Sequence, residues 1–357
     1  MECRSSVVVI VKITHDCNLK CKYCYMQNSR KLGYMDYTLL DTLIKKTLQD
    51  YRCVEFCWHG GEPLLVPDEV YEWIVERQKL YSTKYHCISN TLQTNGTLIN
   101  EKRAELFKKL RFSIGISFDG LIEAQNELRP YRNGNQSYEK VINGIQAVSK
   151  VFGGVGLCCV ISQRNVHEPE KTYYYLKESG ATAVNLIPHM NYPKKDDLSV
   201  DSLELLDFWI SFMRVYMADT FSFTKISPLF QYISSLLGKR EDHCICNTDC
   251  LGDAISIDVD GNIFLCDLID DKTHLGNINE LTGLKKIFES PVYVKIFDEA
   301  KNFIQDYCSE CEWIDICGAG CRVQAFSANG TVGSLDPLCE ARKGFIKWIY
   351  QELKSIS

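Results

Sequence analysis

The stretch VVVIVKITHDCNLKCKYC, Val7–Cys24, decides both the fold and the chemistry of this chain. Its apolar, β-branched beginning predicts a buried strand over Ser6–Ile13. Three cysteines follow at spacings of four and three residues, Cys17, Cys21 and Cys24, so one loop can bring their thiolates together. A four-iron cluster ordinarily takes four thiolates, and three would leave one iron open to an outside ligand.

The number of cysteines, 18 in 357 residues, indicates bound metal rather than disulfides. Chains that depend on many disulfides are short and secreted, whereas the apolar run here is too short to span a bilayer and lacks a signal-peptide cleavage site. We therefore expect a cytoplasmic protein with reduced thiols and no membrane attachment. Zinc is the alternative to iron in the first loop, with His15 as the fourth ligand.

Composition is that of an ordinary globular protein. Hydrophobic residues make up 45% of the chain and charged residues 24%, which is enough apolar side chain for a sizeable core. The net charge of -6 gives no basic excess, so we expect no nucleic-acid partner.

Strand and helix patterns alternate after the first strand. Candidate strands are Cys53–Trp58, His86–Leu92, Arg111–Phe118, Gly156–Ile161 and Ala183–Ile187. Candidate helices are Tyr37–Gln49, Glu69–Tyr81, Glu101–Leu110, Tyr138–Val151 and Glu168–Ser179, the last closed by Gly180. This rhythm predicts an α/β fold of right-handed βαβ units around a parallel sheet. Six units are too few for an eight-fold barrel, so we expect a partial (β/α)6 TIM-like barrel with its chemistry at the carboxyl ends of the strands.

The rhythm changes near Asp201. Two helices with aromatic core faces are expected over Leu203–Met217 and Ile226–Leu237, and then a cysteine-rich region begins. That region shows only short secondary structure, around Ala254–Asp258 and Ile263–Leu268, so bound metal would have to stabilise it. We divide the chain into a partial barrel, a helical bridge and a C-terminal cysteine-rich domain, at 1–200, 201–243 and 244–357.

Glycines and polar side chains follow three consecutive strands. The motifs are Trp58–Pro63 (WHGGEP), Gln93–Gly96 (QTNG) and Ser117–Gly120 (SFDG). Each alone is a plausible turn. Together they place polar groups on the barrel face that carries the cysteine loop, where glycines let a ligand approach the backbone and a carboxylate can meet an ammonium group.

These motifs resemble the radical SAM superfamily, whose signature is three cysteines at this spacing with a following Gly-Gly-Glu-Pro. The resemblance implies a [4Fe-4S] cluster on the first loop. It also implies S-adenosylmethionine (SAM) on the open iron, cleaved to a 5′-deoxyadenosyl radical. By the same resemblance, Gly60, Gly61 and Glu62 would contact the methionine amino group, and Tyr23 would lie near adenine. Ser117 and Arg129 would meet the methionine carboxylate, with Arg132 as a competitor, and Gln93 and Asn95 complete the expected cofactor site.

The later cysteines resemble the SPASM extension of radical SAM proteins, which carries two auxiliary [4Fe-4S] clusters. By resemblance to anaerobic sulfatase-maturating enzymes, one would take Cys244, Cys250, Cys266 and Cys321. The other would take Cys308, Cys311, Cys317 and Cys339. A pair of zinc ribbons is the alternative.

Asp267 directly follows Cys266, and the matching aspartate of the sulfatase-maturating enzymes is a general base. A surface turn carboxylate is the alternative for Asp267, because Asp270 and Asp271 stand close by. The other cysteines are expected to be buried strand or loop thiols: Cys3, Cys53, Cys57, Cys87, Cys158, Cys159 and Cys246. Of these, Cys246 could displace a neighbour as a cluster ligand.

Two enzymatic hypotheses follow from the resemblance. One is a maturase of ribosomally made peptides that oxidises a residue to a crosslink such as a cyclophane or thioether, and Arg129–Gly134 and Leu186–His189 resemble cyclophane-forming maturases. The other is a sulfatase-maturating enzyme that forms formylglycine from Cys or Ser, favoured by Cys244, Asp267 and the cysteine spacing. We place the first slightly ahead. A non-catalytic metal-binding scaffold is a third hypothesis, and the expected electron donor is reduced flavodoxin or ferredoxin. The chain starts too close to Cys17 to carry an N-terminal peptide-recognition domain, so a leader peptide would bind elsewhere.

Overall fold

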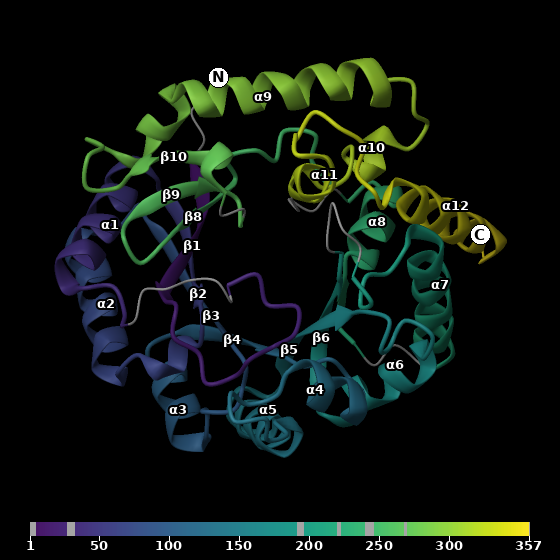
Figure 1. Ribbon diagram of the computed structural model, residues 1–357, viewed down its shortest axis with the longest axis horizontal. Coiled ribbons are helices and arrows are strands. Elements are labelled where there is room, and N and C mark those ends of the chain that lie inside the picture. The colour runs from purple at the N-terminus through teal and green to yellow at the C-terminus, as the bar shows by residue number, and fades with distance from the viewer. Residues whose placement is uncertain are drawn as a thin grey trace.

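One ten-stranded sheet forms the frame of the protein. The computed structural model describes residues 5–26, 33–190, 196–219, 223–239, 246–267 and 270–356 (Figure 1). The order of strands in the sheet is β10-β9-β8-β1-β2-β3-β4-β5-β6-β7. The eight strands from β8 to β7 in this order are parallel to one another, and the β8–β9 and β9–β10 pairs are antiparallel. The strands are β1 (Ser6–Thr14), β2 (Cys53–Gly60), β3 (Cys87–Thr94), β4 (Phe112–Ser117), β5 (Val155–Ile161), β6 (Ala181–Pro188), β7 (Lys225–Ser227), β8 (Ala254–Ile257), β9 (Asn262–Leu265) and β10 (His274–Asn277).

Helices cover the outside of the curved sheet, so that the strands form an open barrel (Figure 1). The barrel helices are α1 (Tyr37–Asp50), α2 (Asp68–Tyr81), α3 (Glu101–Lys109), α4 (Ile122–Leu128), α5 (Tyr138–Phe152), α6 (Pro169–Glu178) and α7 (Ser202–Ala218). The later helices are α8 (Leu229–Leu236), α9 (Pro291–Phe303), α10 (Ile314–Cys317), α11 (Arg322–Asn329) and α12 (Cys339–Ile356). Helix α12 packs against α7, and α9 contacts β10. The expected partial α/β barrel is confirmed.

The two faces of the sheet differ in how deeply their side chains are buried, and β2 is an example. Val54, Phe56 and Trp58 alternate along it and are buried against the helices. The side chains between them face the barrel interior and are exposed or only partly buried: Cys53, Glu55, Cys57 and His59. A complete eight-stranded barrel fills its interior with side chains. Here the interior face is polar and reached by solvent.

The last third of the chain was expected to hold only short secondary structure, and this expectation was wrong. Helix α9 has 13 residues and α12 has 18. In α9 the buried side chains Tyr293, Ile296, Ala300 and Phe303 repeat at helical spacing, which stabilises the segment by ordinary burial.

The helix expected over Ile226–Leu237 begins three residues later, at Leu229. Lys225–Ser227 forms β7 instead, beside β6. Ser227 precedes Pro228, and the residue before a proline is disfavoured in the helical region, so the strand ends and the helix starts around this proline. Every helix within the described ranges is too short or too polar to cross a lipid bilayer.

Candidate active site and metal centres

The cysteine loop after β1 lies directly against the backbone that follows β2. The Gly61 amide donates to the Thr14 carbonyl (2.7 Å) and the Glu62 amide to the Asp16 carbonyl (2.7 Å). A Cβ on Gly61 would lie 2.2 Å from the Asp16 carbonyl oxygen, and one on Gly60 would lie 2.2 Å from that of Thr14. The close neighbour of both glycines is therefore the cysteine loop itself.

The Glu62 side chain ties this junction to the end of β3. Its carboxylate accepts hydrogen bonds from Thr94 Oγ1 (2.7 Å), the Asn95 amide (2.8 Å) and the Leu64 amide (2.9 Å). Burial raises the pKa of Glu62, and the bonds from Asn95, Thr94 and Leu64 oppose that rise. The buried Glu62 carboxylate thus links the end of β2 to the end of β3 through hydrogen bonds.

The loop is held from its other side as well. Lys20 and Lys22 donate their backbone amides to the carbonyls of Pro130 and Leu128, at 2.8 Å each. Arg132 Nε donates to the Cys17 carbonyl at 2.5 Å. The segment after α4 therefore forms the second wall of the loop.

Cys17 accepts two N–H contacts through its sulfur. The Leu19 amide lies 3.4 Å from Cys17 Sγ, and Asn95 Nδ2 lies 3.9 Å from it. Asn95 Nδ2 also donates to Asn18 Oδ1 at 2.8 Å. Asn95 is thus placed at the cysteine loop, as expected.

The three thiols of the loop fit a cationic cluster. Burial raises the pKa of Cys17 to about 11 and that of Cys21 to about 12, the nearby charge of Arg129 opposing the rise at Cys21. Bare thiolates would be costly here, whereas iron ions supply the positive charge that keeps such ligands deprotonated. Cys17, Cys21 and Cys24 are therefore suited to hold three corners of a [4Fe-4S] cluster.

Tyr23 joins a buried ion pair beside this loop. Arg129 Nε and Nη2 donate to the two carboxylate oxygens of Asp119 (3.0 and 3.1 Å), and both side chains are buried. The Tyr23 hydroxyl donates to Asp119 Oδ2 (2.5 Å), and Arg129 lies over the Tyr23 ring at 5.1 Å. Ser117 Oγ accepts from Gln93 Nε2 (3.1 Å) instead of meeting Arg129. In this structure the carboxylate that Arg129 binds is that of Asp119.

A second buried cation, Lys12 of β1, organises the candidate base Asp267. Lys12 Nζ lies 2.5 Å from Asp267 Oδ1, 2.5 Å from the Tyr25 hydroxyl and 3.3 Å from His59 Nδ1. The Tyr25 hydroxyl donates to Asp267 Oδ2 (2.8 Å). Burial would raise the pKa of Asp267, but the Lys12 ammonium holds it below its ordinary value. Asp267 is thus part of an interior network and not an isolated surface turn carboxylate.

His59 is neutral in this network. Burial, with the Lys12 charge beside it, lowers the pKa of His59 to about 4. The Gly60 amide donates to His59 Nδ1 (2.7 Å), so the ring hydrogen is on Nε2. Sequence reasoning missed His59 and Lys12 as site residues; the available signal was a lysine inside an otherwise apolar strand.

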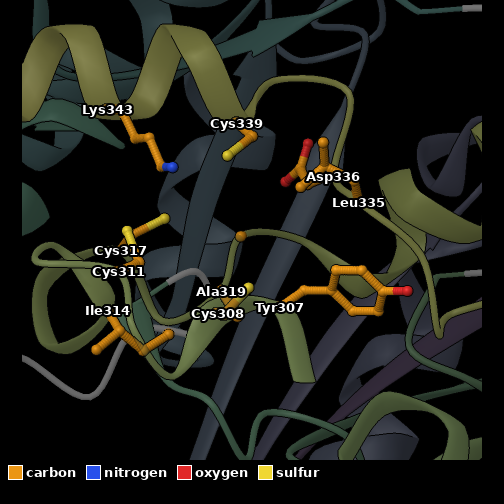
Figure 2. Close-up of a pocket in the computed structure, with 11 residues that line it drawn as sticks. Tyr307, Cys308, Cys311, Ile314, Cys317, Ala319, Leu335, Asp336, Cys339 and Lys343 are labelled. Atoms are coloured by element: carbon orange, nitrogen blue, oxygen red, sulfur yellow. The ribbon is translucent and has the colours of Figure 1, made fainter. Parts of the chain in front are cut away.

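Four cysteines from the C-terminal region line one pocket (Figure 2). They are Cys308, Cys311, Cys317 and Cys339. Burial raises the pKa of the Cys317 thiol to about 11, and Lys343 extends its ammonium toward the pocket (Figure 2). The residues expected to hold the second auxiliary cluster are thus brought together around a space, and their four soft donors fit a [4Fe-4S] cluster.

For the other auxiliary site, three of the four expected ligands are described, Cys250, Cys266 and Cys321, and Cys244 lies outside the described residues. Asp336 connects this site with the pocket, because its Oδ2 accepts the Cys321 amide (2.6 Å) and its side chain lines the pocket. Arg342 forms a buried ion pair with Asp336 (3.0 Å). Nowhere in the described ranges do three Cys, His, Asp or Glu side chains stand together as the ligands of a single metal ion.

The remaining cysteines divide into two groups. Cys159 and Cys246 are buried and Cys57 and Cys158 are partly buried, while Cys3 lies outside the described residues. Cys53 and Cys87 are exposed, so the expectation of buried thiols was wrong for these two. They lie on the interior face of the sheet, which in an incomplete barrel is not packed.

Comparison with known proteins gives consistent matches. Residues 11–176 match the family model of the radical SAM superfamily, and residues 244–312 match that of an iron-sulfur cluster-binding domain, SPASM. A cysteine-type anaerobic sulfatase-maturating enzyme of Clostridium perfringens is 27% identical, covering 98% of each chain. An uncharacterized protein of Methanocaldococcus jannaschii is 30% identical over 81% of this chain and 95% of its own. The solved structure of native anSMEcpe with bound AdoMet and Cp18Cys peptide aligns over 99% of both chains, with a TM-score of 0.88 and 26% identity.

Replacing Gly61 by Ala should empty the first cluster site, because the new Cβ would displace the Asp16 carbonyl and the loop behind it. Anaerobically reconstituted G61A is expected to hold about a third less iron and sulfide than wild type, from about twelve of each per chain if three four-iron clusters are full. The triple variant C17A/C21A/C24A should show the same loss. In G156A the added Cβ meets nothing within 4 Å, and full iron content is expected. Normal iron in G61A would contradict the role given to this contact.

Replacing Asp119 by Asn should destabilise the fold, because it leaves Arg129 as an unpaired buried cation. Removing one partner of a buried ion pair costs about 3–5 kcal/mol. The matched control is D197N, which breaks the exposed ion pair with Arg164 and should cost about 0–1 kcal/mol. Anaerobic urea unfolding followed by circular dichroism measures both, and equal midpoints for the two variants would contradict the assignment.

Proposed function

Since the chain belongs to the radical SAM superfamily and carries a SPASM domain, we propose that it oxidises a side chain of a peptide or protein substrate. The observation that carries this proposal is the meeting of the two parts of the chain at one place. Lys12, at the start of the barrel, holds Asp267, which follows the expected cluster ligand Cys266. A cluster held by Cys266 would put an electron acceptor next to a proton acceptor, the carboxylate of Asp267.

The cofactors are SAM and [4Fe-4S] clusters. When bound, SAM on the open iron supplies a carbon radical that removes a hydrogen atom from the substrate, and the auxiliary clusters take up the electron that the substrate then loses. The protein's own part is to orient the substrate and to receive the proton. We assign the methionine end of SAM to Gly60, Gly61, Glu62 and Ser117, its adenine to Tyr23, and the surrounding contacts to Gln93, Asn95 and Arg129.

We place the proton on Asp267 Oδ2. Oδ1 faces the ammonium of Lys12, a fixed positive charge, whereas Oδ2 accepts a bond from the Tyr25 hydroxyl. A hydroxyl can rotate and accept instead of donating, so a proton on Oδ2 can be donated to the Tyr25 oxygen. Lys12 and Tyr25 therefore act as positioning residues for this carboxylate.

The more specific proposal is sulfatase maturation, the conversion of a Cys or Ser of a protein to formylglycine. Its support is similarity along almost the full chain to sulfatase-maturating enzymes. Peptide crosslinking remains the second candidate, since it needs the same hydrogen abstraction and the same oxidation. Its motif Arg129–Gly134 has a structural role here, because Tyr131 pairs with Leu19 of the cysteine loop. Because this motif helps to hold the cysteine loop, it is no longer a specific argument for crosslinking, and we rank sulfatase maturation above peptide crosslinking.

Electrons for SAM cleavage are proposed to come from reduced flavodoxin or ferredoxin, because the cluster requires a low-potential donor. A surface pocket next to the Cys308–Cys339 pocket shares Cys311 and Lys343 with it. Trp313 and Lys347 also line this surface pocket. It would bring a partner protein close to the second auxiliary cluster.

Incubation with a peptide that carries a sulfatase-type Cys-x-Pro-x-Arg motif tests the substrate. The expected result is replacement of the cysteine side chain by an aldehyde, detected by mass spectrometry and by reaction with a hydrazide probe. A peptide in which Ala replaces the cysteine is the control. A product that has lost two hydrogens and gained a link between side chains would favour crosslinking, and colourless protein containing zinc would favour the scaffold hypothesis.

Replacing Asp267 by Asn should separate SAM cleavage from product formation. Loss of a general base costs about 10²–10⁴-fold in rate, while 5′-deoxyadenosine should still form because hydrogen abstraction precedes proton loss. The control D271N removes an exposed carboxylate four residues away and should behave as wild type. Liquid chromatography of 5′-deoxyadenosine and of the modified peptide gives both quantities. Equal product yields from D267N and D271N would exclude Asp267 as the base.

A further inference from the structure

Two cysteines that no cluster uses stand side by side at the amino-terminal end of the barrel. Cys53 is the first residue of β2 and Cys87 the first of β3, and the two are direct partners in the parallel ladder. Both are exposed. The strands run about 3.3 Å per residue, so this pair lies about 23 Å from Gly60 and the cysteine loop.

Both thiols are on the same face of the sheet. Residues two apart along a strand share a face, so Cys53 is on the side of Glu55, and Cys87 on the side of Thr91. Thr91 Oγ1 donates to Glu55 Oε1 at 2.8 Å, which shows that the interior side chains of β2 and β3 meet. The two sulfur atoms therefore extend from neighbouring strands into the same solvent-accessible end of the barrel.

The backbone fixes their separation. The Cys87 amide donates to the carbonyl of Arg52, the residue before Cys53, at 2.8 Å. Neighbouring strands are about 4.8 Å apart, and partner side chains leave them nearly parallel. Cα atoms at this spacing lie within the range that a disulfide allows, and the structure has both cysteines as free thiols. The pair is therefore available to share an ion.

The number and type of donor atoms, two thiolate sulfurs, indicate which metal ion the pair would bind. Zinc in proteins takes four ligands, and the described part of the chain adds no third Cys, His, Asp or Glu to these two. Two sulfurs on opposite sides of one ion are about 4.6 Å apart if the metal–sulfur distance is about 2.3 Å, as for zinc thiolates, which matches the strand spacing. Thiolates select soft ions, of which Cu(I) accepts linear two-coordinate binding.

We propose that Cys53 and Cys87 form a two-thiolate site for Cu(I). Binding replaces the two thiol protons with one Cu(I) and releases both protons to solvent, with no change of oxidation state. The site lies about 23 Å from the loop of Cys17, Cys21 and Cys24. The expected auxiliary ligand Cys266 is nearer, because its amide donates to Ala254, which pairs with Val8 of the strand next to β2.

Anaerobic titration of the fully reconstituted enzyme with Cu(I), against the chromogenic chelator bicinchoninate, tests the proposal. Wild type is expected to take about one equivalent per chain from the chelator without loss of iron, and X-ray absorption should show two sulfur neighbours. C53S, C87S and the double variant should lose this equivalent while keeping full iron.

A register-shifted variant provides the matched control. C87S/S89C keeps two exposed thiols on the interior face, but Ser89 is the partner of Glu55 and not of Cys53. It should lose the tight site, whereas C53S/C87S/E55C/S89C rebuilds an in-register pair and should regain it. Equal uptake by wild type and C53S/C87S, uptake that releases iron, or tight binding by C87S/S89C would each overturn the proposal.

Discussion

The cysteine loop is held between the ends of two strands and the segment after α4, and this constraint determines the site. The loop has no regular secondary structure of its own, so its shape comes from backbone hydrogen bonds with Gly61, Glu62, Leu128 and Pro130. Gly60 and Gly61 are needed because any side chain there would occupy the space of the loop backbone. These bonds fix the course of the loop backbone that carries the three cysteines, and groups bound at the loop are surrounded by the motifs that hold it.

A second constraint joins the C-terminal region to the barrel. β8 adds to the sheet beside β1, in register from Val8 to Val11. The hairpin β8–β9 then returns beside β1, with Leu265 paired to Ile255 and Ile255 to Val9, so Cys266 and Asp267 follow at the amino-terminal half of β1. From there the Asp267 carboxylate reaches the buried ammonium of Lys12. Because one continuous sheet carries both the first cluster loop and the candidate base, their relative position is as rigid as the sheet. The contact between Lys12 and Asp267 is thus a consequence of the place of β8 beside β1 in the sheet.

Local patterns were enough to predict the first six strands and the longer helices between them, though not the short helix α4, because each βαβ unit repeats the same alternation of apolar runs and glycine breaks. The cysteine spacing likewise predicted which loops would hold clusters, and four of those cysteines line one pocket. Pairings between distant residues could not be predicted: Lys12 was visible only as an interruption of a strand, since its partner Asp267 is set by the place of β8 in the sheet. Arg129 was expected to bind the methionine carboxylate of SAM, whereas in the structure it forms an ion pair with the carboxylate of Asp119. The exposure of Cys53 and Cys87 depends on the barrel being incomplete, which alternation along a strand cannot reveal.

Buried positive charge accompanies the expected cluster sites. The buried basic side chains of the described ranges are Lys12, Arg129, Arg322 and Arg342. Three of them pair with aspartates, which removes most of the cost of burial. Arg322 donates to the carbonyls of Ala319, Val332 and Ser334 instead. Arg129 opposes the rise in the pKa of Cys21, and Arg342 that of Cys317, so both cations stabilise thiolates. Pairing with aspartate lets the chain fold with Arg129 and Arg342 in place, where their charges favour the thiolate forms of the expected ligands Cys21 and Cys317.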